Sequence, residues 1–244
     1  MTEKTFHIFI IFHKNIYDKC YQYISQEDLD KYFTFIAVNE KLPKSYTPNK
    51  YRIINEWEMP NYNPELQKNN YCENSVLYHI FINKIHESYE FIGFFQYDMP
   101  FFTNVVEDIK NGLKNNIKAF YGKNLYHELL QYVLHTDNYN IYIRSNESEC
   151  SPILEYYETY FYKKILKKSI YPYCNTYIIE TTTFGKIMSW IITTYGKVKA
   201  NDNDILACVY ERLMGIAIGE ENTFKKIALL DILHDRNINV FVKQ

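Results

Sequence analysis

The chain has 244 residues, of which 47% are hydrophobic, a length and composition typical of a globular protein with a substantial core. Its formal net charge of −2 at pH 7 argues against a nucleic-acid-binding protein that works through a broad basic surface. No run of 18 apolar residues is present, so we expect no membrane-spanning helix.

The cysteines and the N-terminal residues indicate a compartment. The five cysteines are scattered and none forms a CxxC pair, which excludes a zinc ribbon and argues against a disulfide scaffold. The chain enters an apolar run directly after Glu3 and Lys4, without the apolar core and small-residue cleavage site of a secretory signal. We therefore expect the protein in the reducing cytoplasm.

The first part of the chain alternates apolar strand-like runs with segments of helical spacing. Phe6 to Phe12 is an almost unbroken apolar run, which predicts a strand covered on both faces. The segment over 41–64 contains four prolines and is predicted to be mostly loop, with an extended piece at 51–54. The other elements expected here are, in chain order, a helix over 17–24, a strand over 32–38, a helix over 69–85 and a strand over 89–96.

The second part of the chain continues this alternation. Thr103 and Thr182 are each predicted to cap a helix, and Gly219 is predicted to stop one that begins at about Asp202. The elements expected here are helices over 103–112, 125–134, 151–167, 182–195 and 202–218, strands over 117–121 and 174–180, and a tail over 226–234 that the pattern leaves open between helix and strand.

The order of these elements predicts the fold class. Strands that alternate with helices indicate an α/β fold with a mostly parallel sheet and helices on both faces. No Gly/Ser-rich linker, change of composition or repeat divides the chain. We therefore expect a single domain over residues 1–244.

Several common enzyme signatures are missing from the sequence. No GxGxxG follows the first predicted strand, so a classical dinucleotide-binding fold is not expected. GxxxxGK[ST], GxSxG and HExxH are also absent, which argues against P-loop enzymes, α/β-hydrolases and zinc metalloproteases of those types. The chemistry must therefore come from polar residues outside these motifs.

Polar residues directly follow two of the predicted strands. Asp98 comes just after the strand over 89–96, and His13 and Lys14 follow the first strand. In open α/β sheets, ligands bind outside the carboxyl ends of the strands, and carboxylate oxygens are ligands that Mg²⁺ and Mn²⁺ prefer. An ordinary solvated turn residue is the other interpretation of Asp98, and its local sequence leaves both open.

A second group of acidic residues lies late in the chain. Asp204 and Glu211 are seven residues apart on one predicted helix, so they share a helical face about two turns from each other. Either carboxylate could act as a general base toward a hydroxyl acceptor. A structural ion pair is an equally open interpretation of Glu211 with Arg212. His79, on an earlier predicted helix, is interpreted as a partly buried histidine whose hydrogen bonds are satisfied.

Five short motifs occur in order over residues 6 to about 218. They are Phe12-His13-Lys14, Asn70-Tyr71-Cys72-Glu73, Tyr89-Glu90-Phe91-Ile92-Gly93 leading into Gln96-Tyr97, Cys174-Asn175-Thr176-Tyr177-Ile178-Ile179, and Glu211-Arg212-Leu213. This series resembles the GT-A-like glycosyltransferases of bacterial capsular and exopolysaccharide loci and related enzymes of large DNA viruses. The resemblance implies a GT-A-like, Rossmann-like fold.

One motif departs from the pattern of the family. Where the bacterial proteins have His-Tyr-Arg-Arg, this chain has Gln96-Tyr97-Asp98-Met99. An arginine that could neutralise a diphosphate is thus replaced by an aspartate that cannot. The resemblance implies that Asp98 instead holds Mn²⁺ or Mg²⁺, as the Asp-x-Asp motif of GT-A enzymes does, although Gln96 stands in the place of the first aspartate.

The resemblance also implies a reaction. A sugar would pass from a UDP- or GDP-type nucleotide diphosphate sugar to a glycan or other hydroxyl acceptor, with inversion because no nucleophile is evident. Asp204 is the preferred general base and Glu211 the second choice. Two other functions stay open, a non-catalytic nucleotide-sugar- or carbohydrate-binding domain and a nucleotidyltransferase. The residues expected to bind the donor are His13, Lys14, Glu73, Asn74, Gln96, Tyr97 and Arg212.

Overall fold

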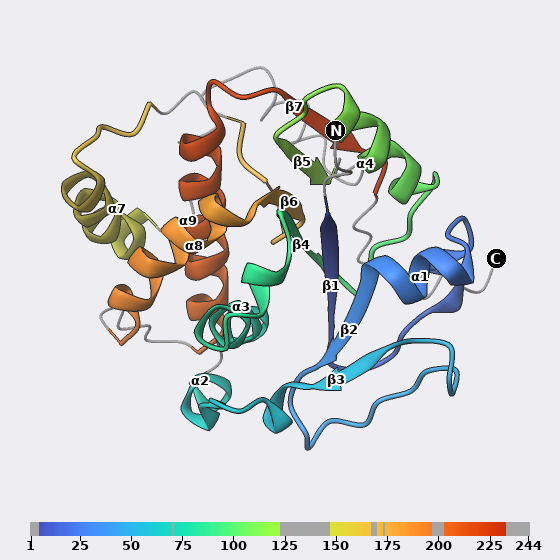
Figure 1. Cartoon of the computed structure of the whole chain (residues 1–244). Helices are drawn as coiled ribbons and strands as arrows, with labels where there is room; N and C mark the ends of the chain where they lie inside the picture. The colour runs from blue at the N-terminus through green and yellow to red at the C-terminus, as the bar shows by residue number, and fades with distance from the viewer. Residues whose placement is uncertain are drawn as a thin grey trace.

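The described strands form one sheet. A computed structural model of the chain describes residues 5–69, 71–122, 147–166, 170–172, 174–196 and 203–232. Seven strands of this part of the chain pair in the order β3-β2-β1-β4-β6-β5-β7 (Figure 1). Their bounds are β1 Phe6–Phe12, β2 Phe33–Ala37, β3 Ile53–Asn55, β4 Phe91–Gln96, β5 Ala119–Gly122, β6 Tyr177–Glu180 and β7 Ile227–Leu230.

Most neighbouring strands run parallel. β1 pairs in parallel with β2 and β4, β2 with β3, and β5 with β7. Only β6 runs against its neighbours, β4 and β5, among the described strands. The predicted α/β class with a mostly parallel sheet is therefore confirmed, and the carboxyl ends of β1, β2 and β4 meet at one edge of the sheet.

Helices cover both faces of this sheet. Helices α3, α7, α8 and α9 lie on one face, and α1 and α4 lie on the other (Figure 1). Within the described residues, no helix has both the length and the apolar character needed to cross a membrane. The helix bounds are α1 Gln26–Tyr32, α2 Pro64–Lys68, α3 Glu73–Ile82, α4 Val105–Lys114, α7 Glu147–Phe161, α8 Thr181–Ile191 and α9 Asn203–Asn222.

The apolar run of β1 explains why the sheet has two covered faces. All seven residues of β1 are buried. Phe9 and Ile11 belong to the core beneath α3, α8 and α9, whereas Ile8 and Ile10 belong to the core beneath α1 and α4. Successive side chains of a strand point to opposite faces, so an uninterrupted apolar run is what a doubly covered strand requires.

The two predicted helix caps are wrong. Asn104 caps α4 instead of Thr103, because its side-chain oxygen accepts the backbone N–H of Glu107 at 3.4 Å. Glu180 holds the cap position of α8, and Thr182 lies inside the first turn. Both errors shift a helix start by one or two residues, which leaves the order of the elements unchanged.

Gly219 does not stop the helix that contains it. α9 continues to Asn222, four residues beyond the predicted end at 218. A Cβ atom at position 219 would lie 2.1 Å from Cδ1 of Tyr171, closer than any real contact. The glycine is thus explained by the close approach of the Tyr171 ring rather than by a helix end.

Other predicted elements differ in length. The helix predicted over 17–24 is only a short 3₁₀ turn, Asp18–Tyr21, and the sequence pattern missed α1. The helix predicted over 69–85 is α3, which is shorter at both ends, and the helix over 151–167 begins earlier and ends at Phe161. The strand predicted over 174–180 is confined to β6, and the tail over 226–234 contains β7. The helix predicted over 125–134 lies outside the described residues.

Candidate functional site

A hollow of about 230 Å³ opens where β1, β2 and β4 end, and we call it the site hollow. The carboxyl ends of parallel strands are where α/β proteins bind ligands, so its position fits a functional site. Residues at the ends of β1, β2 and β4, in the turn after β2, in α2 and at the start of α3 line it. They are Ile11, His13, Val38, Asn39, Leu42, Gln67, Cys72, Glu73, Gln96, Tyr97 and Asp98.

Glu73 is an acidic residue that forms hydrogen bonds with both the end of β4 and the segment before β6. It is the first residue of α3, and its Oε1 accepts hydrogen bonds from Gln96 Nε2 at 3.2 Å and Asn175 Nδ2 at 3.4 Å. Burial raises the pKa of Glu73 and the negative charge of Asp98 raises it further, while Asn175 opposes the rise. Glu73 thus joins the ends of β4 and of the segment before β6.

Glu211 lies on α9 within electrostatic reach of Glu73. Burial raises the pKa of Glu211 to about 7, and the charge of Glu73 adds to the rise. Arg212 and a hydrogen bond from the backbone N–H of Cys174 act in the opposite direction. A carboxyl group that titrates near neutral pH can take up and release a proton under physiological conditions, a property that clusters at functional sites.

His13 and Tyr97 form one wall of the site hollow. Their rings meet edge to face with centroids 5.0 Å apart, and the Tyr97 hydroxyl is 3.5 Å from His13 Nε2. Burial and the charge of Lys14 lower the pKa of His13, and Asp98 only partly offsets them. The lowered pKa favours the neutral form of the His13 ring when no anion is bound beside it.

The backbone is strained at three residues around the site. Cys72, Cys174 and Asn175 all have positive φ, at 52°, 50° and 48°. Such conformations cost about 1–3 kcal/mol each in non-glycine residues and gather at functional sites. Asn175 Oδ1 is also buried without a hydrogen-bond partner in the described structure, so a ligand hydroxyl or cation could satisfy it.

A buried network holds the strained Cys72 peptide directly before Glu73. Glu56 is fully buried and accepts hydrogen bonds from Ser75 Oγ at 2.5 Å and Gln67 Nε2 at 2.8 Å. Ser75 Oγ and Gln67 Nε2 also lie 2.8 and 3.4 Å from the carbonyl oxygen of Cys72. We infer that Glu56 is a positioning residue for Glu73, since it fixes the peptide that precedes it.

His79 belongs to the same network. Its Nδ1 is 2.8 Å from Glu56 Oε1, and its Nε2 accepts the backbone N–H of Asn63 at 2.8 Å. An Nε2 atom that accepts a hydrogen bond leaves the proton of a neutral ring on Nδ1, where it faces the carboxylate. The interpretation of His79 as a histidine with satisfied hydrogen bonds is confirmed, and its side chain is fully rather than partly buried.

The structure brings most of the predicted site residues together. Five of them line the site hollow: His13, Glu73, Gln96, Tyr97 and Asp98. Glu211 and Arg212 are close enough to this group for electrostatic interactions: Glu211 interacts with Glu73, and both Glu211 and Arg212 interact with Cys174. Their roles in binding or catalysis stay predictions.

Two of the other three predicted residues lie differently, and the side chain of the third is outside the described structure. Lys14 is exposed and does not line the site hollow. Asn74 is buried and donates to the backbone oxygens of Tyr71 at 3.2 Å and Ala207 at 3.3 Å, so its side chain ties α3 to α9. Asp204 belongs to α9, and its side chain lies outside the described part of the structure.

Sequence reasoning left several residues out of the predicted site. Asn175 was named only as part of the motif over 174–179 and not as a predicted site residue, yet it donates to Glu73. Its place in the Cys-Asn motif was the available signal. Gln67 and Asn39 line the site hollow from a helix and a turn that carry no motif, so nothing in the sequence indicated them.

Comparisons with known proteins match the fold. No protein-family model and no curated protein sequence matches the chain. The apo structure of the bifunctional glycosyltransferase WbbM matches 94% of this chain with a TM-score of 0.60 and 14% identity. The match covers 45% of WbbM, so the chain spans less than half the length of that protein.

Two further structures match with lower scores. Staphylococcus aureus TarS matches 98% of this chain and 39% of its own, with a TM-score of 0.46 and 8% identity. The apo form of mouse xyloside xylosyltransferase 1 matches 95% of this chain and 97% of its own, with a TM-score of 0.42 and 8% identity. The WbbM match, together with the strand order, confirms the expected GT-A-like fold.

Proposed function

We propose that this chain is a glycosyltransferase that moves a sugar from a nucleotide diphosphate sugar to a hydroxyl group of a glycan. The observation that carries the proposal is a pair of partly buried carboxyl groups, Glu73, which lines the site hollow, and Glu211, which is close enough to Glu73 for their charges to interact. The fold shared with WbbM supports the same reaction class. Fold alone does not fix function, so the site must supply the argument.

Glu211 is the general base in this proposal. The acceptor oxygen attacks the anomeric carbon while the bond from that carbon to the diphosphate breaks, and the nucleoside diphosphate leaves with the bonding electrons. The acceptor proton passes to the Glu211 carboxylate, and the configuration at the anomeric carbon inverts. A base works best with a pKa near the operating pH, which Glu211 satisfies. Asp204, seven residues earlier on α9, is the second candidate.

In this proposal the donor diphosphate would bind at the carboxyl ends of β1 and β4. His13, Gln96 and Tyr97 line this side of the site hollow and provide neutral hydrogen-bonding groups. Lys14 adds a positive charge from the exposed turn beside them. A UDP- or GDP-type donor is expected, and its sugar would face Glu73.

Asp98 would hold Mn²⁺ or Mg²⁺ in this proposal. Within the described residues, no three His, Cys, Asp or Glu side chains converge on one metal position. Mg²⁺ sites of phosphoryl substrates need only one or two carboxylates, with phosphates and water as the other ligands, so Asp98 and the buried Asn175 oxygen suit such a site. The cation would offset negative charge on the leaving diphosphate.

Donor turnover tests the proposal. The chain is incubated with a panel of UDP and GDP sugars, with and without Mn²⁺, and the released nucleotide is identified. Release of nucleoside diphosphate is expected. Release of pyrophosphate would instead indicate a nucleotidyltransferase, and binding without any release would indicate a non-catalytic domain. A donor at 100 times its Kd should also raise the free energy of unfolding by about 2.7 kcal/mol.

Variants separate the base from the donor site. Glu211→Gln should lower turnover by about 10²–10⁴-fold while donor affinity, measured by calorimetry, stays unchanged. Glu27→Gln, an exposed glutamate in the first turn of α1, is the matched control. Normal turnover in Glu211→Gln would remove Glu211 from the mechanism and make Asp204→Asn the next variant to assay.

A further inference from the structure

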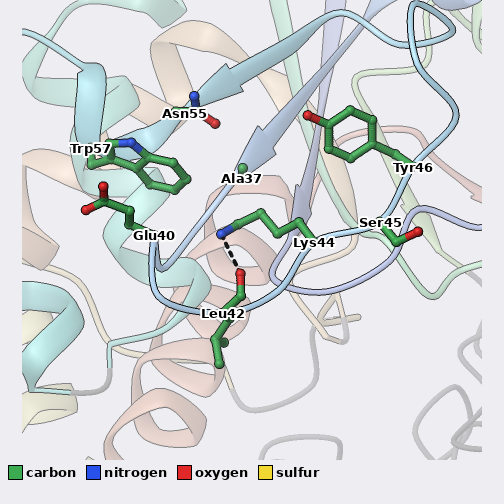
Figure 2. Close-up of a pocket in the computed structure, with 8 residues that line it drawn as sticks. All are labelled: Ala37, Glu40, Leu42, Lys44, Ser45, Tyr46, Asn55 and Trp57. Carbon is green, nitrogen blue, oxygen red and sulfur yellow. Dashed lines mark hydrogen bonds between the residues drawn. The ribbon is translucent and has the colours of Figure 1, made fainter.

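A second hollow of about 450 Å³ lies at the carboxyl ends of β2 and β3. It is a neighbour of the site hollow, since Leu42 lines both, but its other lining residues are different. They come from the turn after β2 and from the β3 end, and Figure 2 shows them: Ala37, Glu40, Leu42, Lys44, Ser45, Tyr46, Asn55 and Trp57. We call it the edge hollow.

Two aromatic rings border the edge hollow. Trp57 and Tyr46 lie on opposite sides of it, and the Lys44 side chain extends between them (Figure 2). Trp57 is half-buried, while Tyr46 is 41% exposed. Aromatic rings with accessible area are rigid apolar surfaces on which a flat or partly apolar ring can pack. Such a pair of rings therefore fits a cyclic ligand.

The ammonium group of Lys44 already makes hydrogen bonds and a ring contact within the protein. Its Nζ donates to the carbonyl oxygens of Asn39 at 2.6 Å and Leu42 at 3.1 Å, and it lies 4.7 Å from the centre of the Trp57 ring. An ammonium group has three donors, and two of them are used here. The carboxylate of Glu40 adds a negative charge to the same hollow. Glu40 is close enough to Lys44 for their charges to interact, so the charges of these two lining residues offset each other, which favours an uncharged ligand over a phosphate.

Short polar side chains supply the remaining contacts. Ser45 offers a hydroxyl and Glu40 a carboxylate that accepts hydrogen bonds. Asn55 donates from Nδ2 to Glu58 Oε2 at 3.1 Å, which orients its amide at the edge of the hollow. Donors and acceptors arranged around aromatic rings match the hydroxyl groups and the apolar face of a pyranose.

We propose that the edge hollow binds an uncharged pyranose unit of the acceptor glycan, with the sugar ring packed against Tyr46 and bordering Trp57, one face of which is covered by the Lys44 ammonium group. This rests on the proposed function in one respect, that the acceptor is a glycan. The hollow would hold a part of the glycan remote from the reacting hydroxyl. Its contribution is binding energy and placement, not chemistry.

Tryptophan signals give a direct test. The chain contains two tryptophans, and Trp190 is fully buried while Trp57 lines the edge hollow. In ¹⁵N-labelled protein, the two indole N–H resonances can be followed during titration with maltohexaose, cellohexaose, laminarihexaose and mannohexaose. Trp57→Phe assigns the signals. We expect a saturable shift of the Trp57 signal with at least one oligosaccharide, and no shift of the Trp190 signal.

A matched pair of variants shows where the sugar binds. Tyr46→Ala should weaken the oligosaccharide by about tenfold, the loss expected for one aromatic contact. Tyr23→Ala is the control, because Tyr23 is also an exposed tyrosine, at 50%, and does not line the edge hollow. Equal affinity in the two variants would overturn the proposal. So would the absence of any Trp57 shift at millimolar oligosaccharide, or a shift caused by uridine or guanosine instead.

The test is independent of catalysis. Saturable oligosaccharide binding without donor turnover would support the edge hollow and refute the proposed function. Donor turnover without a Trp57 shift would refute the edge hollow alone. If both hold, Tyr46→Ala should raise KM for long acceptors and leave the rate of donor hydrolysis unchanged.

Discussion

Glu211 should destabilise the folded protein whenever its carboxyl group is charged. Its pKa is raised from 4.5 to about 7 in the folded chain, so the folded state binds more protons than the unfolded state between these values. The free energy of unfolding therefore falls as the pH rises through this window. Each unit of pKa is worth about 1.4 kcal/mol, so the loss is at most about 3 kcal/mol above pH 7.

Glu211→Gln removes this charge and should reverse the loss. At pH 8 the variant should have a free energy of unfolding up to about 3 kcal/mol higher than the parent chain, and at pH 5 the difference should be small. Transfer activity should be lost in the same variant. Greater stability with lost activity is the trade-off expected where an active site keeps a charged group in an environment that disfavours its charge.

Urea denaturation at pH 5 and pH 8 measures the effect. Glu27→Gln, at an exposed position, should show little difference from the parent chain at either pH. A stability difference between Glu211→Gln and the parent chain that is the same at both pH values would refute the reasoning. It would mean that the carboxyl group titrates alike in the folded and unfolded chains.

Three further variants test other parts of the structure. Asp98→Asn should abolish any Mn²⁺-dependent increase in thermal stability with UDP while leaving the chain folded, and a retained increase would place the cation elsewhere. Glu56→Gln should lower the free energy of unfolding by about 2–3 kcal/mol in urea, because the buried hydrogen bonds of its carboxylate are disrupted. Gly219→Ala should cost about 1–3 kcal/mol in the same assay through its clash with Tyr171, whereas Gly185→Ala, whose added Cβ would meet its nearest neighbour at 3.6 Å, should be neutral or stabilising.

The sequence predicted the central part of the fold because burial there is nearly complete. The β1 and β4 segments are apolar over almost their whole length, and such runs identify strands covered on both faces. α1 was missed because it is short and mostly polar, with Leu29 and Tyr32 as its buried residues. Its cap, Ser25, was the remaining signal, since its side chain accepts the N–H of Asp28 at 3.1 Å.

The candidate site was predictable where motifs follow strands. His13 and Asp98 lie just beyond strand ends, and strands in one sheet bring such residues together. The contacts of Asn74 could not be foreseen in the same way. Its neighbour Glu73 faces the site hollow, but successive helical residues point about 100° apart, so Asn74 faces α9 instead. Two adjacent residues at the start of α3 therefore have different roles, Glu73 in the site hollow and Asn74 in packing between helices.

Burial is the main cause of the raised pKa of both Glu73 and Glu211, and neighbouring carboxylates add to it. Asp98 raises the pKa of Glu73, and Glu73 raises that of Glu211, so each carboxylate makes the next one harder to ionise. Arg212 opposes this rise at Glu211 but does not cancel it. A diphosphate would add more negative charge to the same place. Donor binding should therefore be accompanied either by uptake of a proton by Glu73 or Glu211 or by binding of a cation at Asp98, and the cation leaves both carboxyl groups free to ionise, so that Glu211 can act as a base.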